Sequence, residues 1–309
     1  MADTQAFAAA IDWGTTNMRL WLLDGEGGVL AERSSGEGMR ACMPDRFESV
    51  MEAHLAGLGA APDLPVVVAG MAGARGGWRE AAYLETPARL DALHLNAVCV
   101  DGAARDVRIL PGVCQRERGR KDVMRGEETQ LAGAVAGGLR SGLFCLPGTH
   151  SKWAKLEEGR LVSFTTFMTG ELFALLNQHS ILRDTLGEGA GDAASPAFRD
   201  AVDEMLADGA GLTGKLFSIR AAGLLADDAA PDAKARLSGL LIGAEIAAAR
   251  QMLDNGATVT LIAGGAQGQA YEAALAAADI AYRTLDGSDL VRQGLFGTAT
   301  ALWPEGKAI

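Results

Sequence analysis

The first thirty residues alternate short apolar runs with tight polar turns. An apolar run ends at Asp12, the chain turns through residues 14–17, and a second apolar run covers residues 18–23. Residues 24–28, with the sequence DGEGG, form another turn before the chain becomes apolar again. Bulky apolar runs between glycine-rich turns are typical of β-strands. The pattern predicts two successive hairpins, with Asp12 at the tip of the first.

The same order of elements recurs in the middle of the chain. Residues 143–170, LFCLPGTHSKWAKLEEGRLVSFTTFMTG, again give an apolar run, a glycine turn, a second run, an acidic turn and a third run, and Gly148 lies 134 positions after Gly14. Repetition of one supersecondary unit indicates a duplicated architecture. The sequence therefore predicts two similar α/β domains, residues 1–140 and 141–309, whose glycine turns face one cleft.

The remaining segments continue an α/β alternation. Apolar spacing and β-branched runs predict the following elements: a helix over residues 44–58, strands over 64–69, 96–100 and 107–110, a helix over 123–139, a strand over 259–263 followed by a helix over 269–278, and a closing helix over 289–302 capped by Ser288. Strands that alternate with helices favour layered α/β domains.

Charge and cysteine content narrow the class of partner. The formal net charge of −11 disfavours nucleic acid and anionic membranes as partners, because such binding depends on Lys and Arg contacts to phosphate. The four cysteines show no C-x-x-C spacing, and the four histidines are scattered. A disulfide framework or structural metal is not expected, and the N-terminus lacks a basic leader. We predict a soluble cytoplasmic protein that binds small molecules.

The glycine turns suggest phosphate binding. Backbone N–H groups of a tight Gly/Thr turn form a concave donor site, and glycine lets the backbone approach an anion closely. The residues expected to hold the phosphates of a nucleotide are Gly14, Thr15, Thr16, Asn17, Gly148, Thr149, His150, Ser151 and Lys152. Asp12 is expected to hold Mg²⁺, directly or through water. The alternative is that both glycines are ordinary hairpin residues, and that His150 only shapes its turn.

Several segments together carry a resemblance to a known family. IDWGTTNMRLW, AGMAGARGGWREAAYLETPA, MRGEETQLAGA, LPGTHSKW and FTTFMTGEL are similar to motifs of the 2-dehydro-3-deoxygalactonokinase family, within the actin-like ATPase superfamily. The resemblance runs from residue 11 to about residue 300. It implies two actin-like ATPase (RNase H-like) domains with a nucleotide cleft between them, and an adenosine motif at Gly264 and Gly265. The implied reaction transfers phosphate from MgATP to the 6-hydroxyl of 2-dehydro-3-deoxy-D-galactonate.

The resemblance also suggests catalytic and substrate residues. Gly126-Glu127 is similar to the Gly-Asp that supplies the base in related carbohydrate kinases, so Glu127 is the expected base and Glu128 the second candidate. The alternative role of both glutamates is to favour the dipole at a helix start. A sugar-acid carboxylate requires a cation, which Arg75 is expected to supply. The other expected substrate contacts are Trp78, Arg40, Met71 and Gly73.

Two rival functions are open at this point. One is a kinase of the same architecture that acts on another sugar or sugar acid. The other is an actin-like or chaperone-like ATPase, for which 309 residues leave no visible extra subdomain. A sugar-responsive transcription factor would need a helix-turn-helix segment, whereas this chain starts at the first hairpin. The expected partners are a sugar acid and ATP, with a homodimer left open.

Overall fold

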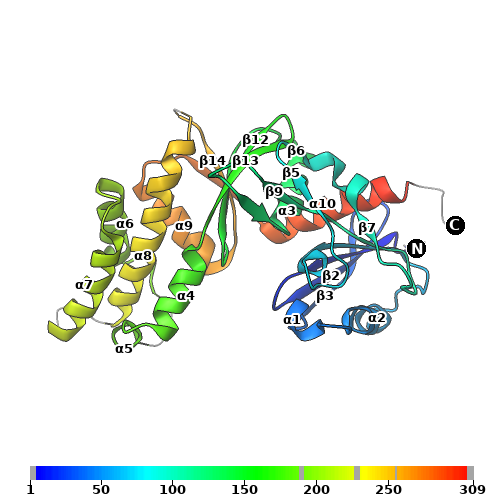
Figure 1. The fold of residues 1–309 in the computed structure, drawn as a ribbon, viewed down its shortest axis with the longest axis horizontal. Coiled ribbons are helices and arrows are strands. Elements are labelled where there is room, and N and C mark those ends of the chain that lie inside the picture. Colours follow the sequence, from blue (N-terminus) through cyan, green and yellow to red (C-terminus); the bar gives the residue numbers. More distant parts are fainter. Residues whose placement is uncertain (1–4, 188–190, 226–229, 255, 305–309) are drawn as a thin grey trace. The chain divides into compact units, whose positions relative to one another are not determined.

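The structure, a computed structural model, describes residues 5–187, 191–225, 230–254 and 256–304. The chain forms two compact units (Figure 1). The first comprises Met1–Ser141, Glu157–Ser163 and Gly287–Ile309, and the second comprises Gly142–Leu156 and Phe164–Asp286. The predicted domains 1–140 and 141–309 differ from these units, because the closing helix and a short segment around residue 160 pack with the first unit.

The first unit is built on a six-stranded sheet of order β3-β2-β1-β4-β8-β7. Its strands are β1 (Ala8–Trp13), β2 (Met18–Leu23), β3 (Val29–Ser35), β4 (Val66–Gly70), β7 (Val98–Cys99) and β8 (Val107–Ile109). β1, β2 and β3 are antiparallel neighbours, whereas β4 runs parallel to β1 and to β8. Successive β1 residues alternate between two apolar cores, because both faces of the sheet are covered.

The other elements of the first unit surround this sheet. They are α1 (Met39–Cys42), α2 (Phe47–Gly57), η1 (Met71–Gly73), β5 (Tyr83–Glu85), β6 (Ala88–Arg89), η2 (Leu90–Asn96), β9 (Gly112–Gln115), β10 (Asp122–Met124), α3 (Glu127–Ala136) and α10 (Gly287–Leu302). β10, β9 and β5 form a small separate sheet. α3 and α10 cross at close range: a Cβ on Gly133 would overlap the Leu290 carbonyl, and one on Gly294 would overlap the Thr129 carbonyl.

The second unit repeats the plan of the first. Its strands are β11 (Gly142–Leu146), β12 (Ser151–Glu157), β13 (Arg160–Phe167), β14 (Val259–Ile262) and β15 (Tyr282–Leu285). They lie in the order β15-β14-β11-β12-β13, with β14 parallel to β11 and to β15. The start of β13 lies in the first unit, where it pairs with β6.

Helices complete the second unit. They are α4 (Thr169–His179), α5 (Arg183–Leu186), α6 (Pro196–Ala207), α7 (Leu212–Leu225), α8 (Ala230–Ala249), η3 (Arg250–Met252) and α9 (Gly265–Ala277). One apolar core joins the sheet to α6, α8 and α9, and a second core lies among α5, α6, α7 and α8. Among the described residues, none of the helices is long and apolar enough to cross a membrane.

The shared strand order confirms the predicted fold class. Each unit has an antiparallel three-stranded meander, followed by two strands parallel to the first, in the order 3-2-1-4-5. This is the plan expected of two similar actin-like ATPase domains. Several boundaries were wrong. The helix expected from residue 44 begins at Phe47, and the helix expected from residue 269 begins at Gly265. The helix expected from residue 123 is preceded by strand β10, and Ser288 lies inside α10 and does not cap it.

Candidate active site

The first glycine turn joins β1 to β2, and its carbonyl oxygens are occupied by hydrogen bonds. Asn17 O accepts from Gly14 N at 2.8 Å. The other three carbonyls accept from the segment that enters α1: Gly14 O from Met39 N (2.9 Å), Thr15 O from Arg40 N (3.1 Å) and Thr16 O from Gly38 N (3.1 Å). All four carbonyls of the turn are therefore hydrogen bonded, and the Gly14 N–H is used within the turn. The N–H groups of the residues that follow Gly14 are the ones that the turn could present to an anion.

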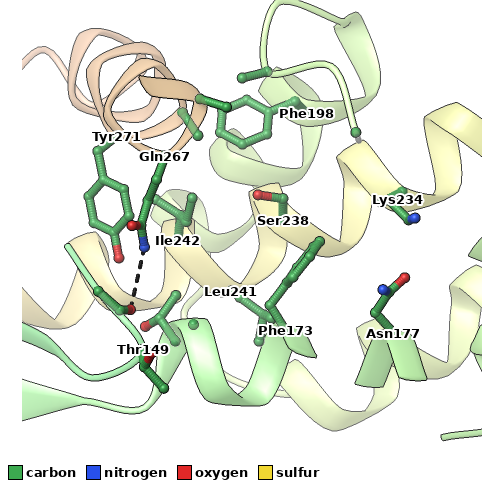
Figure 2. Close-up of a pocket in the computed structure, with 17 residues that line it drawn as sticks. Thr149, Phe173, Asn177, Phe198, Lys234, Ser238, Leu241, Ile242, Gln267 and Tyr271 are labelled. Carbon is green, nitrogen blue, oxygen red and sulfur yellow. Dashed lines mark hydrogen bonds between the residues drawn. The ribbon is translucent and has the colours of Figure 1, made fainter. Parts of the chain in front are cut away.

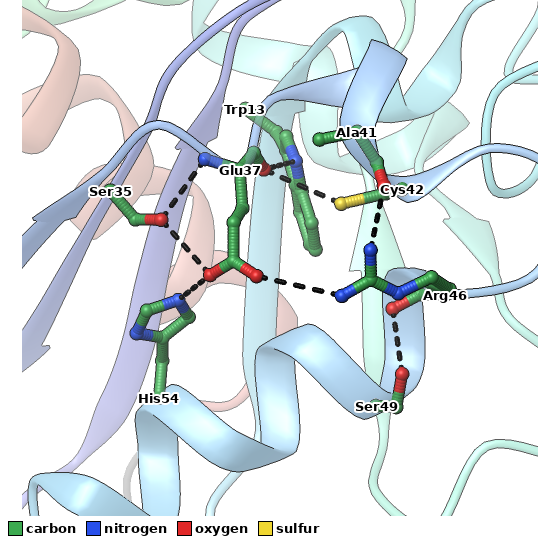
Figure 3. Close-up of polar contacts among 8 residues, drawn as sticks. All are labelled: Trp13, Ser35, Glu37, Ala41, Cys42, Arg46, Ser49 and His54. Carbon is green, nitrogen blue, oxygen red and sulfur yellow. Dashed lines mark hydrogen bonds and ion pairs between the residues drawn. The ribbon is translucent and has the colours of Figure 1, made fainter.

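A polar cluster holds the segment that clamps this turn (Figure 3). The indole Nε1 of Trp13 donates to the Glu37 carbonyl at 3.0 Å. The Glu37 carboxylate contacts His54 Nε2 at 2.8 Å and accepts from Ser35 Oγ at 3.1 Å. These hydrogen bonds lower the pKa of Glu37, His54 contributing most. The cluster fixes Glu37 beside Gly38, whose Cβ, if present, would overlap the backbone of Thr16.

The second glycine turn joins β11 to β12, and its carbonyls are hydrogen bonded by one backbone and two side-chain donors. Thr149 O accepts from Glu171 N at 2.9 Å, His150 O accepts from Lys152 Nζ at 2.9 Å, and Gly148 O accepts from Gln267 Nε2 at 3.4 Å. A Cβ on Gly170, in the first turn of α4, would overlap the Gly148 carbonyl.

The two clamps are equivalent parts of the duplicated plan. In each unit the helix after the third strand, α1 or α4, places a glycine against the glycine turn. Gly38 does so in the first unit and Gly170 in the second. No side chain fits at either contact, so we infer that close helix-to-turn packing is part of how each turn keeps its shape.

Asp12 is paired with an arginine that the sequence analysis did not select. Asp12 Oδ2 lies 2.7 Å from Arg19 Nη2, and Arg19 Nη1 donates to Ser288 Oγ at 2.6 Å. Asp12 and Arg19 are cross-strand partners in the first hairpin. They line a hollow of about 620 Å³ together with Gly14, Asn17, Met18, Ser34, Ser35 and Gly36. The hollow therefore contains both a carboxylate and a guanidinium beside the first turn.

The two candidate bases lie at the start of α3 in different environments. Gly126, with a φ of 108°, precedes the helix and packs near Gly70 at the end of β4. Glu127 is half-buried, and its Oε2 accepts from Arg125 N at 3.1 Å. Glu128 is fully buried, and its carboxylate accepts from Gly126 N at 2.7 and 2.9 Å. Of the two, Glu127 has the more exposed carboxylate.

Glu128 should make folding stability depend on pH. Burial, with the nearby Glu127 charge, raises the pKa of Glu128 from 4.5 to about 8. At a pH between 4.5 and about 8, Glu128 keeps its proton in the folded chain and releases it in the unfolded chain. The free energy of unfolding that this proton contributes is fully present below pH 4.5 and is lost as pH rises through about 8. From pH 5.5 to 7.5 the loss is up to about 3 kcal/mol.

The variant Glu128→Gln stays neutral across this range. Urea unfolding at both pH values should show that the variant loses less stability than the wild type on going to pH 7.5. Parallel pH dependence in the two proteins would contradict the buried, protonated Glu128.

The second unit contains a pocket of about 440 Å³ that begins at the second glycine turn (Figure 2). Gly148 and Thr149 form one edge, and the pocket is lined further by Thr169, Gly170, Phe173, Asn177, Gly191, Ala193, Phe198, Lys234, Ser238, Leu241, Ile242, Ala266, Gln267, Ala270 and Tyr271. Apolar walls with a few polar groups are typical of small-molecule sites, and the volume lies within their usual range. The pocket is suited to a flat apolar group attached to an anion at the turn.

Comparisons with known proteins agree along nearly the whole chain. The model of the family described as 2-keto-3-deoxy-galactonokinase matches residues 12–298. The chain belongs to the 2-keto-3-deoxy-galactonokinase family. A Rhizobium meliloti protein named "Probable 2-dehydro-3-deoxygalactonokinase" is 47% identical over 97% of this chain and 99% of its own length. The Escherichia coli 2-dehydro-3-deoxygalactonokinase is 34% identical over 95% of this chain and 97% of its own.

A solved structure supports the same assignment. The crystal structure of a candidate 2-dehydro-3-deoxygalactonokinase from Sinorhizobium meliloti is 46% identical and has a TM-score of 0.92, covering 96% of this chain and 100% of that one. The predicted family is therefore confirmed, and with it the kinase class.

Most of the predicted substrate residues of this family member lie around the end of β4. Trp13 and Gly70 are partners in the sheet, which places the loop after β4 beside the first turn. Arg75 is exposed in this loop, Met71 is half-buried and Gly73 is buried. Trp78 stacks on Phe47, with ring centroids 6.1 Å apart, and meets Trp13 edge to face at 6.0 Å. Arg40 is exposed on α1.

Some predicted nucleotide residues of the kinase face the interior. Ser151 is buried, and its Oγ lies 2.8 Å from the Tyr271 hydroxyl. Lys152 is 5% exposed, and its ammonium bonds to the His150 carbonyl within its own turn. Both side chains support the turn from inside. His150 is exposed, with Nε2 2.6 Å from Glu171 Oε2, and Gly264 and Gly265 lie at the start of α9 beside the pocket-lining Ala266.

Arg19 and most pocket residues were missed by sequence reasoning. Arg19 carried a usable signal, because a tight hairpin between Asp12 and residue 19 pairs those two positions. Phe173 and Asn177 in α4 and Ser238 in α8 carried none, since these two helices are far apart in the sequence and meet only in the folded unit.

Proposed function

We propose that the chain transfers the γ-phosphate of ATP to the 6-hydroxyl of 2-dehydro-3-deoxy-D-galactonate, giving the 6-phosphate in D-galactonate breakdown. The observation that carries the proposal is the pair of glycine turns whose carbonyls are already hydrogen bonded, in a member of this kinase family. Turns of this construction suit phosphate oxygens. The substrate follows the names of the relatives that match along nearly their full length.

Adenosine is assigned to the pocket of the second unit. Its apolar walls accept a purine, and its edge at Gly148 and Thr149 accepts the phosphates. The turn at residues 14–17 is assigned to the phosphates as well. Gly264 and Gly265 start the helix that forms one pocket wall.

Magnesium is assigned to Asp12. No group of three or more potential protein ligands occurs among the described residues. That fits Mg²⁺ in kinases, which usually takes one or two carboxylates, waters and substrate phosphates. Asp12 offers a carboxylate in the hollow beside the first turn, where one oxygen is shared with Arg19. When bound, the ion would neutralise charge on the phosphates.

The acceptor side is assigned to the first unit. Glu127 takes the proton of the attacking hydroxyl, because its carboxylate is only half-buried at the start of α3. Arg75 pairs with the sugar-acid carboxylate, with Arg40 as the second cation. Met71 and Gly73 shape the loop, and Trp78 supports it through its ring contacts with Phe47 and Trp13.

A substrate panel tests the function. The purified chain is given MgATP with 2-dehydro-3-deoxygalactonate, its gluconate-derived epimer, galactonate, glucose or no acceptor, and ADP release is coupled to NADH oxidation. We expect the first compound to give the highest kcat/KM and a product phosphorylated at O6. Preference for a neutral sugar would favour a different sugar kinase, and equal turnover without acceptor would favour an actin-like ATPase.

Replacing Arg75 should weaken sugar-acid binding selectively. A charge-assisted hydrogen bond contributes about 1.5–3 kcal/mol, so Arg75→Ala should raise the KM for the sugar acid roughly 10- to 150-fold without altering the KM for ATP. Arg79→Ala is the matched control, because Arg79 lies in the same loop but pairs with Asp101 at 3.2 Å. Similar kinetics for the two variants would exclude Arg75 as the carboxylate ligand.

The proposal extends to the location and the assembly of the enzyme. We propose that the enzyme works in the cytoplasm, where ATP is available, and we keep a homodimer as the open alternative to a monomer. Analytical ultracentrifugation of the purified chain measures the assembly.

A further inference from the structure

A carboxylate is buried beneath the pocket of the second unit. Glu245, in α8, is 2% exposed. Its Oε1 accepts from Trp153 Nε1 at 2.8 Å, and its Oε2 accepts from the hydroxyls of Tyr271, at 2.8 Å, and Thr169. Burial raises the pKa of Glu245, and its hydrogen bonds oppose that shift. All three donors are neutral groups, so an ionised Glu245 depends on several well-placed hydrogen bonds.

The three donors come from separate elements that border the phosphate turn and the pocket. Thr169 is the first residue of α4 and precedes Gly170, which packs against Gly148. Tyr271 belongs to α9 and lines the pocket. Trp153 lies in β12, the strand that leaves the turn. One side chain in α8 therefore connects the helix that clamps the turn, the strand after the turn and the helix that walls the pocket.

We propose that Glu245 is a positioning residue for the nucleotide. By holding Thr169 and Tyr271, it fixes the first turn of α4 against Gly148 and fixes α9 as the pocket wall. The inference rests on the proposed function, namely that ATP binds in this pocket. Glu245 is not among the residues that line the pocket, so its effect on the nucleotide passes through these neighbours.

The donor and acceptor chemistry explains why a carboxylate is needed. Indole can only donate, so an oxygen of residue 245 must accept from Trp153. With Glu245 ionised, both hydroxyls also donate to it, and Tyr271 can then accept from Ser151 Oγ at 2.8 Å. A glutamine replaces one acceptor oxygen with an NH₂ donor, which forces the Thr169 and Tyr271 hydroxyls to turn. The expected result is a displaced clamp and wall in a chain that still folds.

Steady-state kinetics of Glu245→Gln and Tyr271→Phe test the proposal. For both variants we expect the KM for ATP to rise 5- to 50-fold, while the KM for the sugar acid changes less than twofold. Glu52→Gln is the matched control: it breaks the ion pair with Arg105, at 2.7 Å, in the other unit. We expect it to lower Tm without a selective change in the KM for ATP.

Two outcomes would overturn the proposal. An unchanged KM for ATP in both variants overturns the proposal. A fall in Tm with equal changes in both KM values, as expected of a purely structural residue, also overturns it. If Glu245→Gln fails to fold, Tyr271→Phe and Thr169→Val decide between these outcomes. Calorimetric titration of the wild type with ATP tests the proposed function separately. A wild type that does not bind ATP would contradict the proposed function, whatever the kinetics of the variants.

Discussion

Replacing Glu127 with glutamine should reduce kcat by about 10²- to 10⁴-fold, the range expected for loss of a general base. Glutamine has nearly the same shape but cannot accept the proton of the acceptor hydroxyl. The change lies at the start of α3, outside both the second glycine turn and the pocket of the second unit. The dissociation constant for ATP, measured by calorimetry, should therefore stay within about twofold, while coupled ADP release reports the lost turnover.

Glu128→Gln is the control for this experiment. Its carboxylate is fully buried and accepts hydrogen bonds from Gly126 N and Thr129 Oγ1, so it supports the helix start from inside. We expect its kcat to stay within a fewfold of the wild type. If Glu128→Gln were the inactive variant and Glu127→Gln the active one, the assignment of the base would be reversed.

The glycine turns could be predicted because their signal is local. A turn sequence such as Gly14 to Asn17 between apolar runs specifies a hairpin whatever the rest of the chain does. The duplication was visible for the same reason, since Gly148 begins an equivalent turn in an equivalent pattern. Family motifs then led to the confirmed kinase family. The roles of Glu127 and Arg75 stay predictions that the proposed variants test.

The parts that escaped prediction depend on contacts between distant segments. Gly38 and Gly170 look like ordinary loop glycines in the sequence. In the structure, however, the backbone of a glycine turn lies so close to each of them that a Cβ would not fit. The strand β10 was read as helix because Val123 and Met124 are compatible with either structure, and its pairing with β9 decides the outcome. α10 packs with the first unit because Gly133 and Gly294 allow α3 to approach it.

Asp12→Asn should reduce kcat/KM by about 10²- to 10³-fold, the second large effect we expect. A metal ion contributes several kcal/mol of charge stabilisation in phosphoryl transfer, and each 1.4 kcal/mol corresponds to a tenfold change in rate. The amide is a much weaker ligand for a hard cation than the carboxylate. The substitution also removes the charge partner of Arg19, which lies 2.7 Å away, and leaves a guanidinium free to pair with phosphate.

These two consequences give Asp12→Asn a distinctive signature. The Mg²⁺ concentration for half-maximal activity should rise at least tenfold, whereas ATP binding in the presence of EDTA should stay equal or become tighter. Asp24→Asn is the matched control, because Asp24 caps the other hairpin turn through Glu26 N and Gly28 N, at the opposite end of β2. An unchanged Mg²⁺ requirement in Asp12→Asn would mean that Asp12 serves only to orient Arg19. The cation beside the first turn would then be the arginine, and the metal would have to be held elsewhere.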